Sequence, residues 1–184
     1  CSIMCDNNII KNNYNEKLQR IGIRTYYKYI PLLNKFFFIR RLKEKNHLLW
    51  FSTSEVFLSY YKSIKKYYPN SKFIFDMVDI HHLRYQRALE FDPNNKKYKR
   101  RYKRYYKYEL RSSELADLII AISDDEKTYM TQFAKESKVI VISNVHYFKV
   151  DLNKIPGFGD RKDLLFIGSS HHPNIDAINF LKYD

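Results

Sequence analysis

Short apolar runs alternate with longer amphipathic stretches along this chain, and the alternation limits the possible folds more than any other property of the sequence. The runs predict strands at residues 23–27, 47–51, 73–76, 118–122 and 139–142, and the stretches predict helices at residues 15–21, 31–45, 54–68, 95–116 and 124–134. Strands that alternate with helices in this way usually pair in parallel, with the helices packed on the sheet. The sequence therefore predicts an α/β fold with a largely parallel sheet covered by helices.

A polar stretch over residues 143–162 contains the densest turn signal of the chain, with Pro156, Gly157 and Gly159 close together. Such clusters separate regular elements, so we place a domain boundary here. Residues 1–150 are expected to form one domain that lacks its first strand, residues 151–162 a linker, and residues 163–184 the start of a second domain. That start consists of a strand at 164–167 and a helix at 173–182, a βα unit without a sheet of its own.

Composition narrows the classes of function. The formal net charge of +13 predicts attraction to polyanions, which include nucleic acids, anionic lipid headgroups and phosphorylated substrates. The longest apolar runs are far shorter than the ~18 residues that a membrane-spanning helix needs. Cys1 and Cys5 form no metal-binding or redox spacing with other cysteines or histidines, so we expect neither a disulfide framework nor a zinc site.

Six residues with acid–base or ionic chemistry follow the strand at residues 73–76: Asp76, Asp79, His81, His82, Arg84 and Arg87. We expect residues 77–94 to form a loop at the carboxyl end of the sheet, where open α/β sheets bind ligands. A histidine beside a carboxylate can act as a base or donate a hydrogen bond to a sugar oxygen, and paired arginines can grip a phosphate. The alternative interpretation is a surface ion-pair network, in which the histidines only end a strand.

The run from Phe75 to Arg87, FDMVDIHHLRYQR, resembles the signature of glycosyltransferases of family four, the group 1 glycosyltransferases. Three further segments agree in order: residues 17–23 resemble the early helix-to-strand step of the family's acceptor domain, residues 114–126 its late strand, and residues 164–177 the opening of its donor domain. The resemblance implies the GT-B fold. The chain would contain most of the acceptor-side Rossmann-like domain and the first βα unit of a second, donor-side Rossmann-like domain.

The resemblance also implies an activity, which is the transfer of a sugar from a nucleotide-sugar donor to a glycan or lipid-linked acceptor in cell-surface polysaccharide synthesis. Neither a metal nor a cofactor is expected. By this resemblance His81 lies near the transferred sugar, and Asp79 orients it or acts as the base. Asp76, Arg84 and Arg87 would line the acceptor side.

Two further groups of residues follow from the same resemblance. Ser123 and Glu126 would shape the cleft, although a serine ahead of acidic residues is also an ordinary helix cap. Gly168, Ser169 and His171 would contact the donor, whose diphosphate the following helix start would favour; a tight turn is the alternative. This chain alone is expected to be inactive, and the protein is expected in the cytoplasm, with peripheral contact at the inner face of the membrane.

Residues 96–107 hold eight Lys or Arg residues interleaved with Tyr98, Tyr102, Tyr105 and Tyr106. The pattern fits a nucleic-acid surface, a contact with an anionic membrane, or tyrosines packed on the sheet with cations facing water, which the helical spacing favours. A sugar-transferring enzyme half and a basic binding module both remain open, and a degenerate noncatalytic transferase-like domain is a third possibility. The acidic and histidine cluster at residues 76–82 favours a sugar site over nucleic acid, which acidic groups repel.

Overall fold

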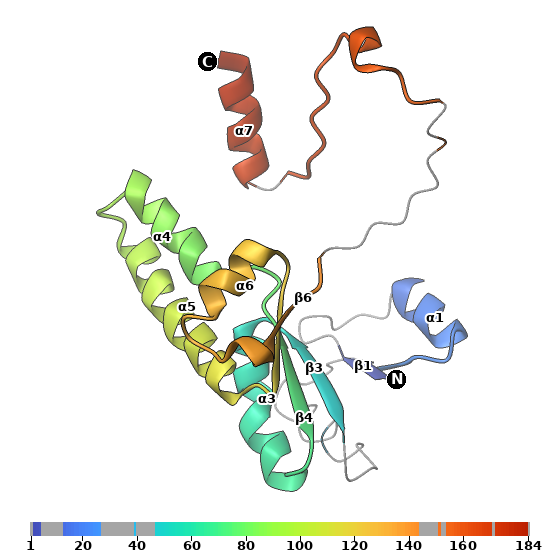
Figure 1. Ribbon diagram of the computed structural model, residues 1–184, viewed down its shortest axis with the longest axis vertical. Coiled ribbons are helices and arrows are strands. Elements are labelled where there is room, and N and C mark those ends of the chain that lie inside the picture. Colours follow the sequence, from blue (N-terminus) through green and yellow to red (C-terminus); the bar gives the residue numbers. More distant parts are fainter. Residues whose placement is uncertain are drawn as a thin grey trace. The chain divides into compact units, whose positions relative to one another are not determined.

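A computed structural model of the chain describes residues 2–4, 13–26, 39, 47–143, 151, 154–170 and 172–183. The chain divides between Asn144 and Val145 into two compact units (Figure 1). The predicted linker, residues 151–162, falls within the second unit. Each unit is described by itself.

Four parallel strands form the main sheet of the first unit: β3 (Leu48–Ser52), β4 (Lys72–Asp76), β5 (Leu118–Ala121) and β6 (Val139–Val141), in that order (Figure 1). The register pairs Phe51 with Phe75 and Ile119 with Val139. Each strand agrees with its predicted limits to within one residue. The predicted α/β fold with a parallel sheet flanked by helices is therefore confirmed.

The helices of this unit are α3 (Ser54–Tyr67), α4 (His81–Phe91), α5 (Lys96–Leu115) and α6 (Asp124–Met130), followed by the 3-10 turn η1 (Glu136–Lys138). Helix α3 buries Phe57, Tyr60 and Ile64, which recur at the spacing of one helical face. The ring of Phe57 contacts the rings of Phe73 and Phe75 on β4. This aromatic cluster forms the core beneath the sheet.

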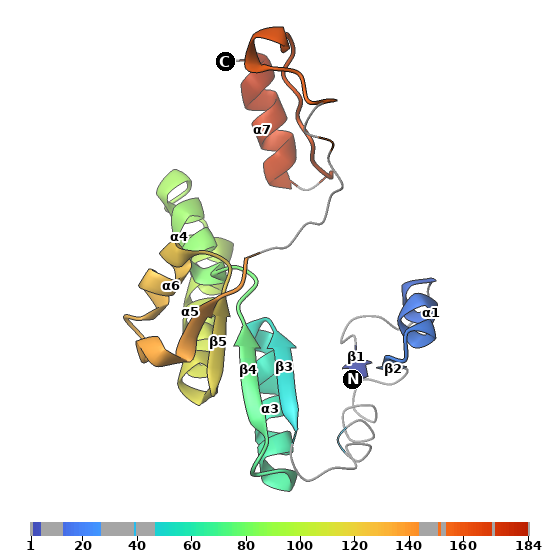
Figure 2. The same ribbon diagram turned by 45° about the vertical axis from the view of Figure 1, so that its right-hand side comes forward.

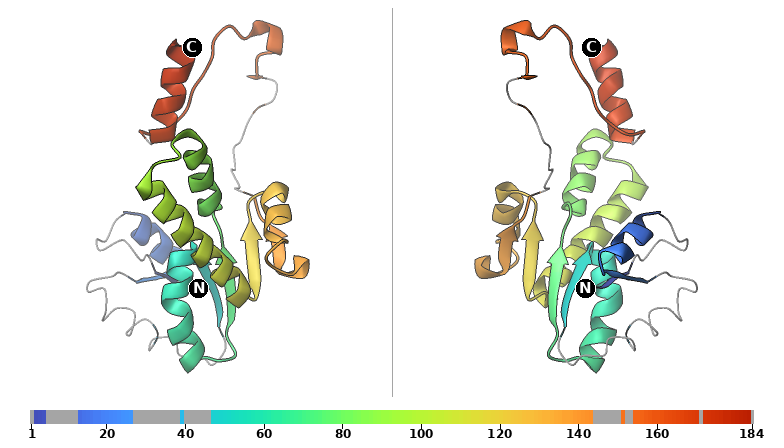
Figure 3. Two further views of the ribbon diagram at one scale, coloured as in Figure 1. Left: turned by 90° about the vertical axis from the view of Figure 1, so that its left-hand side faces the viewer. Right: turned by 90° about the vertical axis from the view of Figure 1, so that its right-hand side faces the viewer.

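The predicted loop over residues 77–94 is wrong, because most of it forms helix α4. Figure 3 shows α4 and α5 side by side as an antiparallel pair. The residue before α4, Ile80, makes no side-chain hydrogen bond to the helix, so the local sequence lacks the usual start signal. The next predicted helix, residues 124–134, is confirmed only as far as Met130, where α6 ends.

The first residues of the unit form helix α1 (Asn13–Arg20) and a two-stranded parallel sheet of β1 (Ser2–Met4) and β2 (Arg24–Tyr26). Gly22 ends α1 with a φ of 81°, the left-handed conformation that glycine adopts at low cost. The strand β1 is not predicted by the sequence pattern. The helix expected over residues 31–45 lies, apart from Ile39, outside the described residues.

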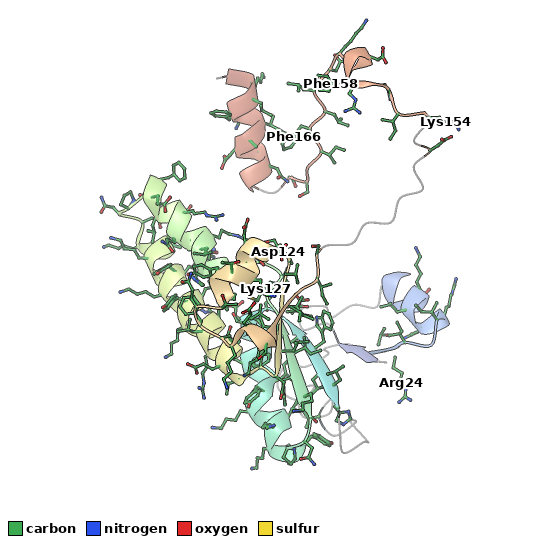
Figure 4. All side chains as sticks on the ribbon, in the orientation of Figure 1. Arg24, Asp124, Lys127, Lys154, Phe158 and Phe166 are labelled. Atoms are coloured by element: carbon green, nitrogen blue, oxygen red, sulfur yellow. The ribbon has the colours of Figure 1, made fainter. Side chains whose placement is uncertain are left out.

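The second unit contains the 3-10 turn η3 (Phe158–Asp160) and helix α7 (His172–Tyr183), which confirms the helix predicted there (Figure 2). The strand predicted at residues 164–167 is wrong, because this segment has no regular structure. A strand needs a hydrogen-bonded neighbour, and the described part of this unit offers none. Leu164 and Ile167 are accordingly 96% and 84% exposed, and Phe166 lies on the same extended segment (Figure 4).

Among the residues that the structure describes, no helix combines the length and apolar character needed to cross a membrane.

Candidate functional site

The candidate site begins at the carboxyl end of β4, where Asp76 ties three segments together. Its carboxylate accepts hydrogen bonds from Trp50 Nε1 of β3 at 2.9 Å and from the backbone amide of Val78 at 3.1 Å. Its carbonyl oxygen accepts a hydrogen bond from the backbone amide of Thr53 at 3.0 Å. Asp76 therefore fixes the loops that follow β3 and β4.

Both of these loops contain a strained residue. Thr53 has a φ of 75° and Val78 a φ of 61°, in the left-handed region that β-branched side chains disfavour. Such strain costs on the order of 1–3 kcal/mol per residue, and it tends to occur at functional sites, where surrounding contacts hold it in place. The two strained residues follow the carboxyl ends of neighbouring strands. The candidate ligand site therefore lies at this end of the sheet.

The buried carboxylate of Glu109, on α5, is the centre of the cluster beside this edge. One oxygen, Oε1, accepts a hydrogen bond from the backbone amide of His81 at 2.9 Å. The other, Oε2, accepts hydrogen bonds from the backbone amide of His82 at 3.2 Å and from His82 Nδ1 at 2.5 Å. Glu109 thus binds the first two amides of α4 and supplies the cap that the local sequence lacks.

His81 is the partly exposed member of the cluster, with 19% of its side chain accessible. Its Nδ1 lies 3.0 Å from the carbonyl oxygen of Asp79 and 3.3 Å from Glu109 Oε1. Both neighbours can only accept, so Nδ1 carries a proton. Its ring stacks on Tyr105 of α5, with centroids 5.0 Å apart. Within the described residues, Nε2 makes no hydrogen bond, so it is the ring atom left for a ligand.

His82 is fully buried and has both ring nitrogens engaged. Its Nδ1 contacts Glu109, and its Nε2 lies 2.8 Å from the hydroxyl of Tyr129 on α6. The rings of Tyr102 and Tyr106 pack edge-on against it. His82 therefore joins α4, α5 and α6 and has a structural role.

The pKa values of the cluster follow from these contacts. The hydrogen bond with Glu109 raises the pKa of His81 above its ordinary value of 6.5, although burial works against the rise. Burial alone would raise the pKa of Glu109, but the hydrogen bonds from His81 and His82 outweigh it, and the pKa is lowered. The cluster therefore favours an anionic Glu109 and a protonated His81.

The carboxylate of Asp79 does not contact the ring of His81. It forms an ion pair with Arg84, and only its backbone oxygen contacts the histidine. Asp79 thus contacts His81 through its carbonyl group, while Glu109 supplies the carboxylate beside the ring. Both Arg84 and Arg87 are exposed on α4, but Arg87 forms no ion pair with a described residue.

Ser123 and Glu126 cap helix α6. Ser123 Oγ accepts a hydrogen bond from the amide of Glu126 at 3.2 Å, and Glu126 Oε2 accepts one from the amide of Ile122 at 3.1 Å. Burial, followed by the charge of Asp79, raises the pKa of Glu126 despite its amide contacts. The capping alternative is therefore confirmed, and Glu126 also lies within electrostatic reach of the loop that leads to α4.

The residues expected to contact a donor lie in the second unit. Gly168 lies close to α7, because a Cβ atom added at this glycine would be only 2.9 Å from Asn174 Nδ2. Asn174 Nδ2 donates a hydrogen bond to the carbonyl oxygen of Ser169 at 3.0 Å. His171 lies outside the described residues. These contacts hold the loop against the start of helix α7.

The sequence interpretation did not mention Glu109 or Tyr129, and it named Tyr105 only as a packing residue, outside the site. A signal for Glu109 exists, because it follows Tyr98, Tyr102 and Tyr105 on the packed face of α5 at helical spacing. A carboxylate on such a face must find partners when it is buried. Tyr129 carries no comparable signal, since only the tertiary fold brings α6 to His82.

Within the described part of the chain, no group of three or more His, Cys, Asp or Glu side chains is arranged so that it could hold a metal ion. Comparisons of the chain with protein-family models, with curated proteins and with solved structures find no match. The parallel sheet and the cluster around Glu109 are therefore the observations on which a function can be based.

Proposed function

We propose that the first unit is the acceptor side of a GT-B glycosyltransferase, which transfers a sugar from a nucleotide-sugar to a glycan or lipid-linked acceptor. The placement of His81 carries this proposal. Its ring lies beyond the carboxyl end of β4, Glu109 holds Nδ1, and Nε2 has no partner among the described residues. The resemblance of residues 75–87 to the family-four signature points to the same histidine.

In this proposal His81 acts as a hydrogen-bond donor. Because Glu109 raises the pKa of His81, a larger share of the imidazole is protonated near neutral pH. A protonated Nε2 donates a hydrogen bond to an oxygen of the transferred sugar and favours negative charge that develops on the leaving group. A fixed donor of this kind is effective because it needs no reorganisation during the reaction.

The remaining residues have supporting roles. The carbonyl oxygen of Asp79 and the carboxylate of Glu109 fix the tautomer and orientation of the His81 ring, and Asp76 fixes the loops around it. Arg87 is exposed on the same helix and is available to an acidic acceptor group. The second unit would be the start of the donor-side domain, in which Gly168, Ser169 and His171 approach the nucleotide-sugar.

The test is a donor screen on the longer protein that this proposal implies. The purified protein is incubated with a panel of nucleotide-sugars, and released nucleotide is measured with and without acceptor glycans. Release from one donor by wild type supports the proposal. A folded protein that is inert to every donor contradicts it and favours a noncatalytic transferase-like domain.

A further inference from the structure

Helix α5 has two faces of different character. Its packed face carries Tyr98, Tyr102, Tyr105 and Glu109, which contact α4 through Tyr85 or the two site histidines. Eight cations between residues 96 and 107 lie outside this packed face, and all of them are exposed. The sequence has no acidic residue between positions 96 and 108. The cationic face therefore lacks the interspersed carboxylates of an ordinary solvated helix surface.

Two of these cations have partners within the protein. Arg101 donates a hydrogen bond to the hydroxyl of Tyr85 at 2.7 Å, and Arg104 pairs with Glu55 at 2.9 Å. The other six make no ion pair with any described residue, and we call them the α5 basic stripe: Lys96, Lys97, Lys99, Arg100, Lys103 and Lys107. Lys96, Arg100, Lys103 and Lys107 recur at spacings of three to four residues, so they lie along one side of the helix, and Lys97 and Lys99 flank them. Figure 4 shows nitrogen-tipped side chains projecting from α5.

An exposed aromatic residue lies where the stripe begins. Phe91 ends α4 and is 90% exposed. The turn that follows is tight, since the amide of Asn95 donates a hydrogen bond to the carbonyl oxygen of Asp92 at 3.2 Å, and α5 starts at Lys96. The tip of the α4–α5 pair thus combines an apolar ring with the first cations of the stripe. Glu90 and Asp92 lie at the same tip, and the Asp92 carboxylate accepts a hydrogen bond from Asn95 Nδ2.

We propose that the α4–α5 pair docks on an anionic lipid membrane through the α5 basic stripe, with Phe91 entering the headgroup region. The negative surface potential of such a membrane attracts cations that lie close to it. An apolar ring that is buried at the boundary between headgroups and acyl chains strengthens the binding further. The inference goes beyond sugar transfer, because the stripe faces away from Glu109 and needs no donor or acceptor.

A membrane fits these observations better than a nucleic acid does. Proteins that bind single strands offer aromatic rings on which successive bases stack. On α5 the rings are already packed: Tyr105 stacks on His81 and on Tyr85, and Tyr102 stacks on Tyr106. These packed rings cannot stack on bases, so the exposed cations are left to bind anionic groups by charge alone. A layer of anionic headgroups needs no more than that.

The test measures binding of the 184-residue chain to vesicles of phosphatidylcholine, with and without phosphatidylserine. The stripe variant replaces Lys99, Lys103 and Lys107 by Gln. A matched variant replaces three exposed lysines outside the stripe, Lys62, Lys66 and Lys135, by Gln and so loses the same charge. Circular dichroism confirms that both variants are folded.

We expect binding only to vesicles with phosphatidylserine, and binding that weakens as salt is raised. The stripe variant should bind at least about tenfold more weakly than wild type, and the matched variant should bind nearly as wild type does. Phe91→Ser should weaken binding several-fold without changing its salt dependence. No binding to anionic vesicles, or equal losses in the two lysine variants, overturns the proposal. Tighter stripe-dependent binding to a single-stranded oligonucleotide than to vesicles also overturns it.

Discussion

At the scale of single residues, the buried Glu109 determines the protonation of the site. Its contact with His81 is the largest cause of the raised pKa of that histidine, and contacts with both histidines lower its own pKa. Below pH 6.5 the protonated His81 stabilises the fold, and this contribution is lost as the pH rises through its raised pKa. The ionised Glu109 stabilises the fold above pH 4.5, and this contribution is lost as the pH falls through its lowered pKa.

Glu109→Gln should therefore lower the pKa of His81, because it removes the negative charge and the strongest acceptor. The His81 ring protons, followed by NMR during a pH titration, report this pKa directly. We also expect the variant to lose about 1–3 kcal/mol of stability, since an amide oxygen cannot replace both carboxylate oxygens. A His81 pKa equal to that of wild type would show that Glu109 does not control this histidine.

The two adjacent histidines should respond differently to substitution. His82→Ala leaves a cavity among Tyr102, Tyr106 and Tyr129. It also removes one of the partners of Glu109 and the ring nitrogen that contacts the Tyr129 hydroxyl, so it should cost about 2–4 kcal/mol. His81→Ala should cost about 1 kcal/mol, because the ring is partly exposed. Urea unfolding of both variants measures the difference. Equal losses would contradict the assignment of a structural role to His82 alone.

The sequence indicated which residue types lie near this site, but not which of them contact one another. Asp79 follows β4 as the strand pattern predicted, whereas His81 and Arg84 lie on helix α4 instead of the predicted loop. The carboxylate that holds the histidine, however, is Glu109 rather than Asp79, which pairs with Arg84. Contacts between residues 28 positions apart depend on how α4 packs on α5, and no local pattern contains that information.

At the scale of elements, helix starts show which signals are local and which are not. Helices α5 and α6 begin with side-chain caps from Asn95 and Ser123, and both were predictable from sequence. Helix α4 was not predictable, because its cap comes from another helix. The segment at residues 164–167 shows the converse: its apolar pattern suits a strand, but a strand forms only beside a partner.

The cap of α5 gives a direct test of local control. Asn95 Oδ1 accepts a hydrogen bond from the amide of Tyr98 at 3.1 Å, so Asn95→Ala should destabilise the first unit by about 1 kcal/mol. The neighbouring Asn94 is exposed and offers a matched control, whose replacement by Ala should change stability by less than about 0.5 kcal/mol. The midpoints of urea unfolding compare the two variants. A larger loss in the Asn94 variant would contradict this account of the helix start.

At the scale of the whole molecule, the two units should differ in stability. The first unit has an aromatic core beneath a four-stranded sheet, whereas residues 164–167 of the second unit are exposed and lack a paired strand. Hydrogen exchange of the 184-residue chain should therefore be slow for the amides of β4 and β5 and fast for those of residues 164–167. Slow exchange at residues 164–167 would show that this segment has a strand partner.

The central claim is our proposal that His81, held by Glu109, takes part in sugar transfer. The most direct test is to measure the kcat of three forms of the longer protein that this proposal implies. These are wild type, His81→Ala and the control Gln86→Ala, which replaces an exposed residue on the same helix. We predict that His81→Ala lowers kcat by about 10²–10⁴-fold, as expected for the loss of a positioned proton donor, while Gln86→Ala retains wild-type kcat. A folded His81→Ala variant with the kcat of wild type would contradict the claim.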